Sequence, residues 1–246
     1  MMTLFKRFLL WPLLLTGHFL AISLLSWHLL AQINFAYPLG YQLLDIDQHI
    51  QLYAPENRYK SDFAQTTPVE HQQIFEQITQ AVQHQGQGLA EISYRLPDGS
   101  YTRLMREPEV VHLQDVANLI DVVYWTGLLG ALFWLLLFAY AFQKKLTLPA
   151  LKKILSGFLS VLIILTLIVL LIGPTKVFYW LHEQVFPDEH EWFFFYQDSL
   201  MTTLMKAPDL FGFISVILAV VFMLLWTLTL WGMVKSLKLK GNNPEK

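Results

Sequence analysis

The stretch EVVHLQDVANLID, Glu109–Asp121, carries ionisable side chains directly into a long apolar segment. Residues three apart on a helix are neighbours, so we expect His112 beside Asp115, with Glu109 one turn before it. The following residues, 122–142, are almost entirely apolar. This pattern predicts a helix that starts at a membrane interface and ends inside the bilayer. Ionisable groups at such a place indicate a functional site.

The composition of the whole chain is typical of a membrane protein. Of its 246 residues, 54% are hydrophobic and 15% are aromatic, and the apolar residues occur in blocks too long for helices of a soluble core. The chain contains no cysteine, which excludes disulfides, thiolate nucleophiles and cysteine-type zinc sites. It has no glycine-rich phosphate-binding loop, so we expect no nucleic acid, nucleotide, flavin or other cofactor to bind.

Four apolar blocks predict four transmembrane helices. A cleaved signal peptide is the alternative for the first block, but that block is longer than the apolar region of such peptides and no good small-residue cleavage site follows it. His18 lies inside this block, and we expect it to find a hydrogen-bond partner within the helix bundle. The predicted parts are a first span at 1–33, a cap at 34–118, a second span at 119–142, a turn at 143–153, a third span at 154–173, a loop at 174–208, a fourth span at 209–234 and a tail at 235–246.

The segment between the first two spans has the signals of a small folded cap. Residues Thr67–Glu70, TPVE, form a capping box with proline at the first helical position, which predicts a helix that ends near Gly86. Alternating residues on both sides of the turn Pro97–Ser100 predict a β-hairpin. Tyr41–Phe63 is less regular, and we expect another strand or two from it. The predicted fold class is an α-helical integral membrane protein with four spans and a small α+β extracytoplasmic cap.

Basic residues predict the orientation of the chain. Ten of the 17 lysines and arginines flank the N-terminus, the turn between the second and third spans, and the C-terminus, and these regions hold only Glu245 among 19 acidic residues. Since lysine and arginine are enriched on the cytoplasmic side, both termini are predicted to be cytoplasmic. The cap and the loop at 174–208 are then predicted to lie on the outer side.

The second outer loop carries another histidine in aromatic surroundings. His182 follows Tyr179-Trp180-Leu181, and Trp192 and Asp198 lie downstream. A single histidine near a membrane is more often structural than catalytic. His112 and His182 are both predicted at the outer interface beside a span, and this shared depth favours a catalytic pair.

These motifs resemble those of a family of four-span bacterial membrane proteins that includes the lipoprotein intramolecular transacylase. The residues that carry the resemblance are Glu109-x-x-His112-x-x-Asp115-Val116 before a span, and Leu181-His182-x-x-x-Phe186 followed by Trp192, Asp198 and Pro208. The resemblance implies that His112 and His182 are the catalytic residues. The residues expected to support them are Glu109, Asp115, Trp192 and Asp198.

The resemblance also implies the reaction and its setting. An acyl chain would move from the glyceryl moiety of a diacylglyceryl-modified lipoprotein to the α-amino group of the same lipidated N-terminal cysteine. The implied partners are those lipoproteins and membrane lipid, at the outer face of the bacterial inner membrane. The sequence does not specify the oligomeric state.

Two histidines suit this chemistry, because the amine must lose a proton and the departing glyceryl oxygen must gain one near neutral pH. Asp115 or Glu109 is expected to hold His112 in one tautomer.

Two alternatives stay open at this point. One is a metal-dependent membrane hydrolase, although His112-x-x-Asp115 lacks a second histidine on the same helix face. The residues that would build its metal site are His112, Asp115, His182, Glu183 and His190. The other alternative is a non-enzymatic membrane protein whose cap binds a partner, in which both motif histidines are structural.

Overall fold

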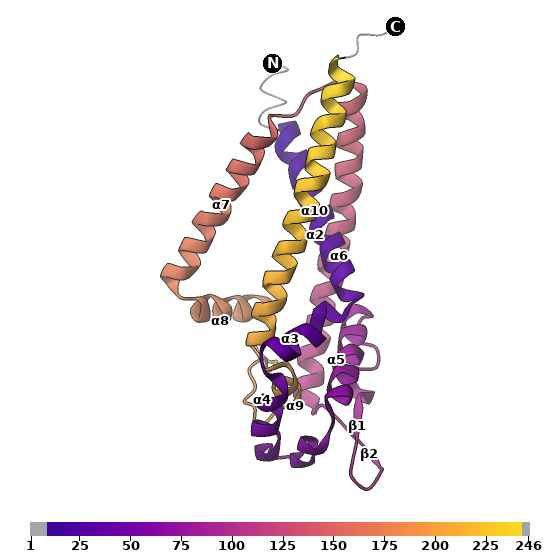
Figure 1. The fold of residues 1–246 in the computed structure, drawn as a ribbon, viewed down its shortest axis with the longest axis vertical. Helices are drawn as coiled ribbons and strands as arrows, with labels where there is room; N and C mark the ends of the chain where they lie inside the picture. The colour runs from indigo at the N-terminus through magenta and orange to yellow at the C-terminus, as the bar shows by residue number, and fades with distance from the viewer. Residues whose placement is uncertain (1–8, 243–246) are drawn as a thin grey trace. The chain divides into compact units, whose positions relative to one another are not determined.

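The computed structural model describes residues 9–242 and is mostly helical. Within this described part, four helices are long and apolar enough to cross a membrane, which confirms the predicted number of spans (Figure 1). They are α2 (Trp11–Ala31), α6 (Glu107–Gln143), α7 (Leu151–Ile172) and α10 (Asp209–Asn242). The ends of the predicted first span and tail, residues 1–8 and 243–246, lie outside the described residues.

The chain folds as two compact units, which we call the helical unit and the cap unit. Among the described residues, the helical unit comprises 9–26, 123–181 and 219–242, and the cap unit comprises Trp27–Val122 and His182–Leu218. The polar start of α6 and both motif histidines therefore belong to the same unit.

Close contact between α2 and α6 in the helical unit depends on glycine. A Cβ added at Gly130 would lie 2.6 Å from the Cβ of Leu20, and one added at Gly127 would lie 2.7 Å from the Cβ of Leu24. Small residues allow helices to approach closely in membranes, where packing rather than water exclusion holds them together. In the same unit the buried His18 has its Nε2 2.9 Å from Thr229 Oγ1 on α10, which confirms the expected hydrogen bond.

Helix α7 packs on this unit through its first part alone. Leu151, Leu155 and Phe158 lie against the core of the helical unit, whereas almost every residue from 159 to 172 is exposed. Figure 1 shows α7 diverging from α10 toward its C-terminal end. Gly173 follows with φ of +101°, a conformation that side chains disfavour, and it lets the chain turn sharply into α8 (Pro174–Val185).

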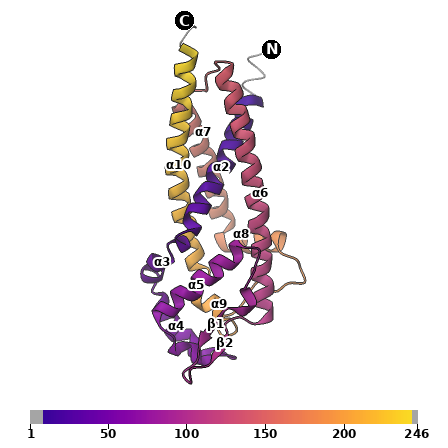
Figure 2. The same cartoon turned by 90° about the vertical axis from the view of Figure 1, so that its right-hand side faces the viewer.

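The cap unit gathers short helices and one hairpin around its own apolar core (Figure 2). Tyr37 and Phe63 are almost wholly buried there, and the ring of Tyr37 stacks on Phe75 at a centroid distance of 3.9 Å. The regular elements are α3 (Tyr37–Leu43), α4 (Ile46–Tyr53), α5 (Pro68–Gln83), β1 (Ser93–Arg95), β2 (Tyr101–Arg103), α9 (Leu200–Met205) and the 3-10 turns η2 (Asn34–Ala36), η3 (Ala54–Glu56), η4 (Ser61–Gln65) and η5 (Leu89–Glu91).

The helix and the hairpin predicted in the cap are both present. The backbone N–H of Glu70 donates to Thr67 Oγ1 at 3.3 Å, and the backbone N–H of Thr67 donates to Glu70 Oε2 at 2.9 Å, which completes the capping box of α5. Strands β1 and β2 pair antiparallel, with Tyr94 opposite Thr102. The turn between them has Gly99 at φ of +89°, as this kind of turn requires.

The prediction of further strands in Tyr41–Phe63 is wrong, because this segment is helical. It holds the last residues of α3, all of α4 and two 3-10 turns. Ile46 and Ile50 are fully buried, and their four-residue spacing places them on one face of α4. In such a short, polar stretch, two apolar residues at helical spacing do not predict a helix by themselves. The helix is stable because the rest of the cap buries this face.

Candidate active site

The cap unit brings the two motif histidines against a common aromatic ring. His112 comes from the polar first part of α6, and His182 comes from the last turn of α8. Phe186 has its ring centroid 4.9 Å from that of His112 and 5.3 Å from that of His182. Phe194 lies 6.0 Å from His112, and Trp192 lies 4.8 Å from His182. Two imidazoles from separate helices therefore share an apolar, aromatic surrounding.

The environment of His112 favours its neutral form. The residue precedes the apolar segment at 119–142 and is half-buried. Burial lowers the pKa of His112 and the nearby His182 lowers it further, while Asp115 acts in the opposite direction. Its Nδ1 is buried and has no hydrogen-bond partner among the described residues, so Nε2 is the nitrogen through which His112 can exchange a proton.

Asp115 has a different partner from the one that the sequence predicted. Its Oδ2 lies 2.6 Å from Nδ1 of His190, in the segment between α8 and α9. The expectation that Asp115 or Glu109 holds the His112 ring in one tautomer is therefore not met by this geometry. Residues three apart on a helix differ by about 60° in direction, so Asp115 can reach a side chain that approaches from a neighbouring segment.

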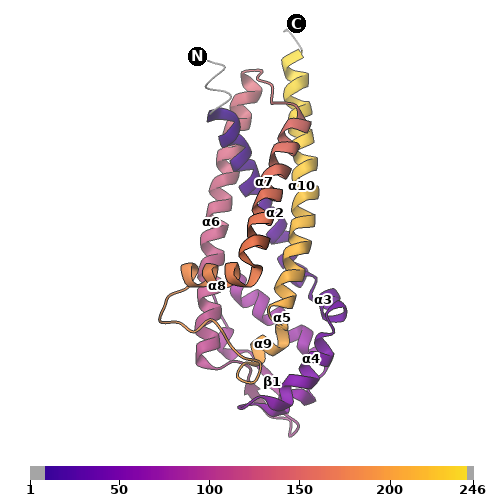
Figure 3. The same cartoon turned by 90° about the vertical axis from the view of Figure 1, so that its left-hand side faces the viewer.

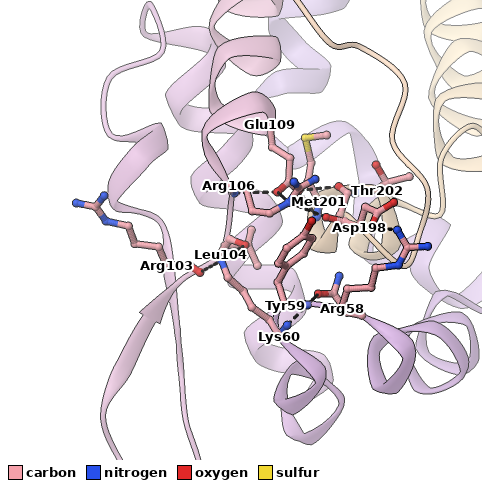
Figure 4. A network of polar contacts seen from close by, with 12 residues as sticks. Arg58, Tyr59, Lys60, Arg103, Leu104, Arg106, Glu109, Asp198, Met201 and Thr202 are labelled. Carbon is pink, nitrogen blue, oxygen red and sulfur yellow. Dashed lines mark hydrogen bonds and ion pairs between the residues drawn. The ribbon is translucent and has the colours of Figure 1, made fainter.

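The hydrogen-bond partners of Glu109 are residues other than His112. Its side chain is 1% exposed, and its Oε1 accepts a 2.6 Å hydrogen bond from Ser199 Oγ and a 3.3 Å bond from the backbone N–H of Met201. Its Oε2 accepts a 2.8 Å bond from the backbone N–H of Arg106 (Figure 4). Burial raises the pKa of this carboxyl, and the hydrogen bonds from Ser199 and Arg106 oppose that shift.

Asp198 belongs to the same polar network as Glu109. Its Oδ1 accepts a 2.9 Å bond from Nη1 of Arg58, and its backbone oxygen accepts a 2.8 Å bond from Nε of Arg106 (Figure 4). The guanidinium of Arg106 also lies over the ring of Tyr59, 4.6 Å from its centroid. Of the four predicted supporting residues, Trp192 contacts His182 through its ring, whereas Asp198 and Glu109 stabilise the surrounding structure.

The sequence placed Phe186 in a motif and His190 in a possible metal site, but it left the contacts of both residues unassigned, as it did Phe194, Ser199 and Arg106. Phe186 and Phe194 supply the aromatic surroundings, Ser199 and Arg106 satisfy Glu109, and His190 pairs with Asp115. Ser199 did carry a signal, because it precedes α9 and its Oγ accepts a 3.0 Å bond from the backbone N–H of Thr202 as a helix cap. Arg106 lies only three residues before Glu109, whereas the Asp115–His190 pair and the ring contacts of His112 join distant parts of the chain and leave no local pattern.

The acidic and histidine side chains are spread out rather than convergent. Within residues 9–242, no three of them gather closely enough to form a candidate metal site. The polar groups of the site are instead two imidazoles facing aromatic rings and two carboxylates, each engaged with a different part of the segment between α8 and α9.

Fold and site together define a multi-pass membrane protein with a pair of histidines in an aromatic setting. The family model described as lipoprotein intramolecular transacylase Lit matches residues 13–211, and the chain belongs to this family. It is accordingly an acyltransferase of the lipoprotein intramolecular transacylase type, with lipoproteins as substrates. This membership decides against the alternative of a non-enzymatic, partner-binding protein.

A solved structure agrees with the fold. The membrane-integral lipoprotein intramolecular transacylase Lit from Bacillus cereus, determined with one histidine-to-arginine mutation, matches this chain with a TM-score of 0.60 and 17% identity. The match covers 93% of this chain and 91% of that chain. No curated protein sequence matches this chain.

Proposed function

We propose that this protein moves an acyl chain from the glyceryl moiety of a diacylglyceryl lipoprotein to the α-amino group of the same lipidated N-terminal cysteine, giving a lyso-form lipoprotein. We propose further that His112 and His182 carry the proton transfers. The observation that supports this most directly is their contact with the same ring, Phe186, from two different helices.

The reaction needs no group beyond the two histidines and the substrate. The amine nitrogen attacks the ester carbonyl carbon, a carbon–nitrogen bond forms, and the bond between that carbon and the glyceryl oxygen breaks. The nitrogen loses one proton and the glyceryl oxygen gains one. Two imidazoles at the reacting centre can act as base and acid for these transfers.

The surroundings of the two histidines suggest how these roles are divided. A neutral imidazole accepts a proton, and burial keeps His112 neutral by lowering its pKa. We therefore assign the base role to His112, acting through Nε2, and the acid role to His182. The aromatic rings around both residues exclude water and favour an acyl chain, and the substrate's own membrane anchor supplies proximity.

The site should lie at the outer interface of the bacterial inner membrane, with both termini in the cytoplasm. Lysine and arginine are concentrated in the regions assigned to the cytoplasm. Tyr179 and Trp180 on α8 are 39% and 56% exposed. Exposed aromatic side chains of this kind are typical of a membrane–water interface.

Mass spectrometry of lipoprotein N-termini tests the reaction. Bacteria that express the wild-type protein should convert diacylglyceryl lipoproteins to a form with one acyl chain on the α-amine and one on the glyceryl group. Cells expressing His112→Ala or His182→Ala at equal membrane abundance should keep the diacylglyceryl form. An unchanged lipoprotein pattern with the wild-type protein would refute the proposed reaction.

A further inference from the structure

The segment 187–199 has no helix or strand of its own (Figure 3). It nevertheless carries two side chains that contact His112 and His182. Trp192 lies 4.8 Å from His182, and Phe194 lies 6.0 Å from His112, measured between ring centroids. Without a ladder of backbone hydrogen bonds, the position of such a segment depends on its side-chain contacts. Tyr196, Gln197 and Asp198 near its end contact α4 and Arg58 of the cap, and two further contacts join the segment to α6.

The two contacts with α6 lie on either side of His112. Three residues before His112, Glu109 accepts the 2.6 Å hydrogen bond from Ser199 at the end of the segment. Three residues after His112, Asp115 makes its 2.6 Å contact with His190 near the start of the segment. The two carboxylates of the motif thus fasten the segment to the turns of α6 that carry His112.

The contact between Asp115 and His190 is the one beside the histidine rings. The Asp115 side chain is 15% exposed and that of His190 is 38% exposed, so the pair is partly shielded from water. The backbone N–H of His190 also donates to Pro187 O at 3.0 Å, which fixes the turn that presents the imidazole. A short hydrogen bond to a carboxylate in this setting is stronger and more directional than an exposed ion pair.

We propose that Asp115 and His190 are a positioning pair for acyl transfer. Their contact fixes the start of the segment 187–199 on α6 and thereby sets Trp192 against His182. Neither residue exchanges a proton with the substrate. This inference rests on the proposed function and adds His190 as a residue on which the rate depends.

The measurement is kcat and KM of acyl transfer by the full-length protein in detergent, with a diacylglyceryl lipopeptide as substrate. Asp115→Asn and His190→Ala should each lower kcat by about 10- to 100-fold, since a misplacement of about 1 Å at a reacting centre has an effect of this size. KM should change less than kcat, because the substrate's own membrane anchor holds it near the site. The double variant should be no slower than the slower single variant, because both changes break one contact.

Two further variants separate positioning from folding. His190→Gln keeps a hydrogen-bond donor for Asp115 and should retain more activity than His190→Ala at equal melting temperature. Glu191→Gln changes a neighbouring exposed acid of the same segment and should match the wild type in kcat.

A cysteine reporter provides a readout that does not depend on turnover. The chain has no cysteine, so Phe194→Cys introduces a single thiol at a side chain that is 7% exposed. Reaction of this thiol with a polar maleimide should become faster when His190→Ala is added and should stay slow when Glu191→Gln is added.

The outcomes distinguish this inference from the proposed function. A wild-type protein that fails to transfer the acyl chain refutes the proposed function. An active wild type, with folded Asp115→Asn and His190→Ala variants at wild-type kcat, refutes the positioning pair alone. Losses that multiply in the double variant would also refute it, since the two residues would then act independently.

Discussion

The three ionisable residues of the motif face different surroundings at the scale of single side chains. His112 meets aromatic rings, Glu109 is enclosed by hydrogen-bond donors, and Asp115 reaches His190. They are spaced three residues apart within about two turns of the helix. Each side chain is therefore rotated by about 60° from the one before it and meets a different part of the cap. The motif thus combines one candidate catalytic group with two structural carboxylates.

We expect His112 and His182 to behave as one catalytic unit. If one accepts the amine proton and the other protonates the glyceryl oxygen, removing either residue blocks the same step. His112→Ala, His182→Ala and the double variant should therefore be almost equally inactive per folded molecule. The measurement is acyl transfer by each purified variant, together with its melting temperature. Wild-type activity in either single variant, or activity lost only in proportion to folded protein, would contradict the two-histidine mechanism.

Glu109→Gln should destabilise the protein by about 1–3 kcal/mol, the range for leaving buried polar groups unsatisfied. Ser199, Met201 and Arg106 all donate to the carboxylate of Glu109, and an amide would present a donor to at least one of them. The measurement is thermal unfolding in detergent, with Glu107→Gln as the matched control, because Glu107 is an exposed acid in the first turn of the same helix. Equal melting temperatures for the two variants would remove Glu109 from the structural network.

At the scale of elements, a buried histidine of α5 links this helix to two other segments of the cap. His71 has its Nδ1 2.7 Å from the hydroxyl of Tyr41 on α3 and its Nε2 2.7 Å from Oγ1 of Thr66. Burial lowers the pKa of His71 to about 4, while the nearby Asp47 and Glu70 act in the opposite direction. The packing of three segments therefore depends on an imidazole that is neutral at neutral pH.

The cap should lose stability as the pH falls from about 6.5 toward about 4. Over this range an unfolded chain binds a proton at His71 more readily than the folded cap does, so acid favours unfolding. We expect His71→Gln to show a smaller drop in melting temperature between pH 7 and pH 5 than the wild type. The measurement is circular dichroism during heating at both pH values. An equal drop in the two proteins would show that His71 does not contribute to the acid sensitivity.

The whole molecule is organised by where its charges lie along the chain. Lysines cluster between α6 and α7 and near the end of α10, while the long helices are apolar and α7 exposes most of its residues. Exposed apolar side chains are costly in water and favourable in lipid, so these helices fit a bilayer. The cap unit has its own buried core, and hydrogen bonds from Ser199, Met201 and Arg106 surround its buried Glu109.

Cysteine labelling of intact cells should reveal the orientation. The chain has no cysteine, so single cysteines at the exposed positions Gln87 and Lys152 are clean reporters of the cap and of the first turn of α7. An impermeant maleimide should label Gln87→Cys in intact cells, whereas Lys152→Cys should react only after the membrane is opened. The reverse pattern would place the candidate site in the cytoplasm and contradict the proposed lipoprotein reaction.

The sequence by itself determined the number of spans, the helix α5 and the hairpin, because each depends on a local pattern of apolar length, capping residues or turn residues. It also singled out His112 and His182 through their motifs. The tertiary structure alone decided that Asp115 pairs with His190 and Glu109 with Ser199. It also decided that Tyr41–Phe63 is helical. The two side-chain pairs join segments far apart in the chain. A local pattern cannot specify them, because these segments meet only when the cap folds.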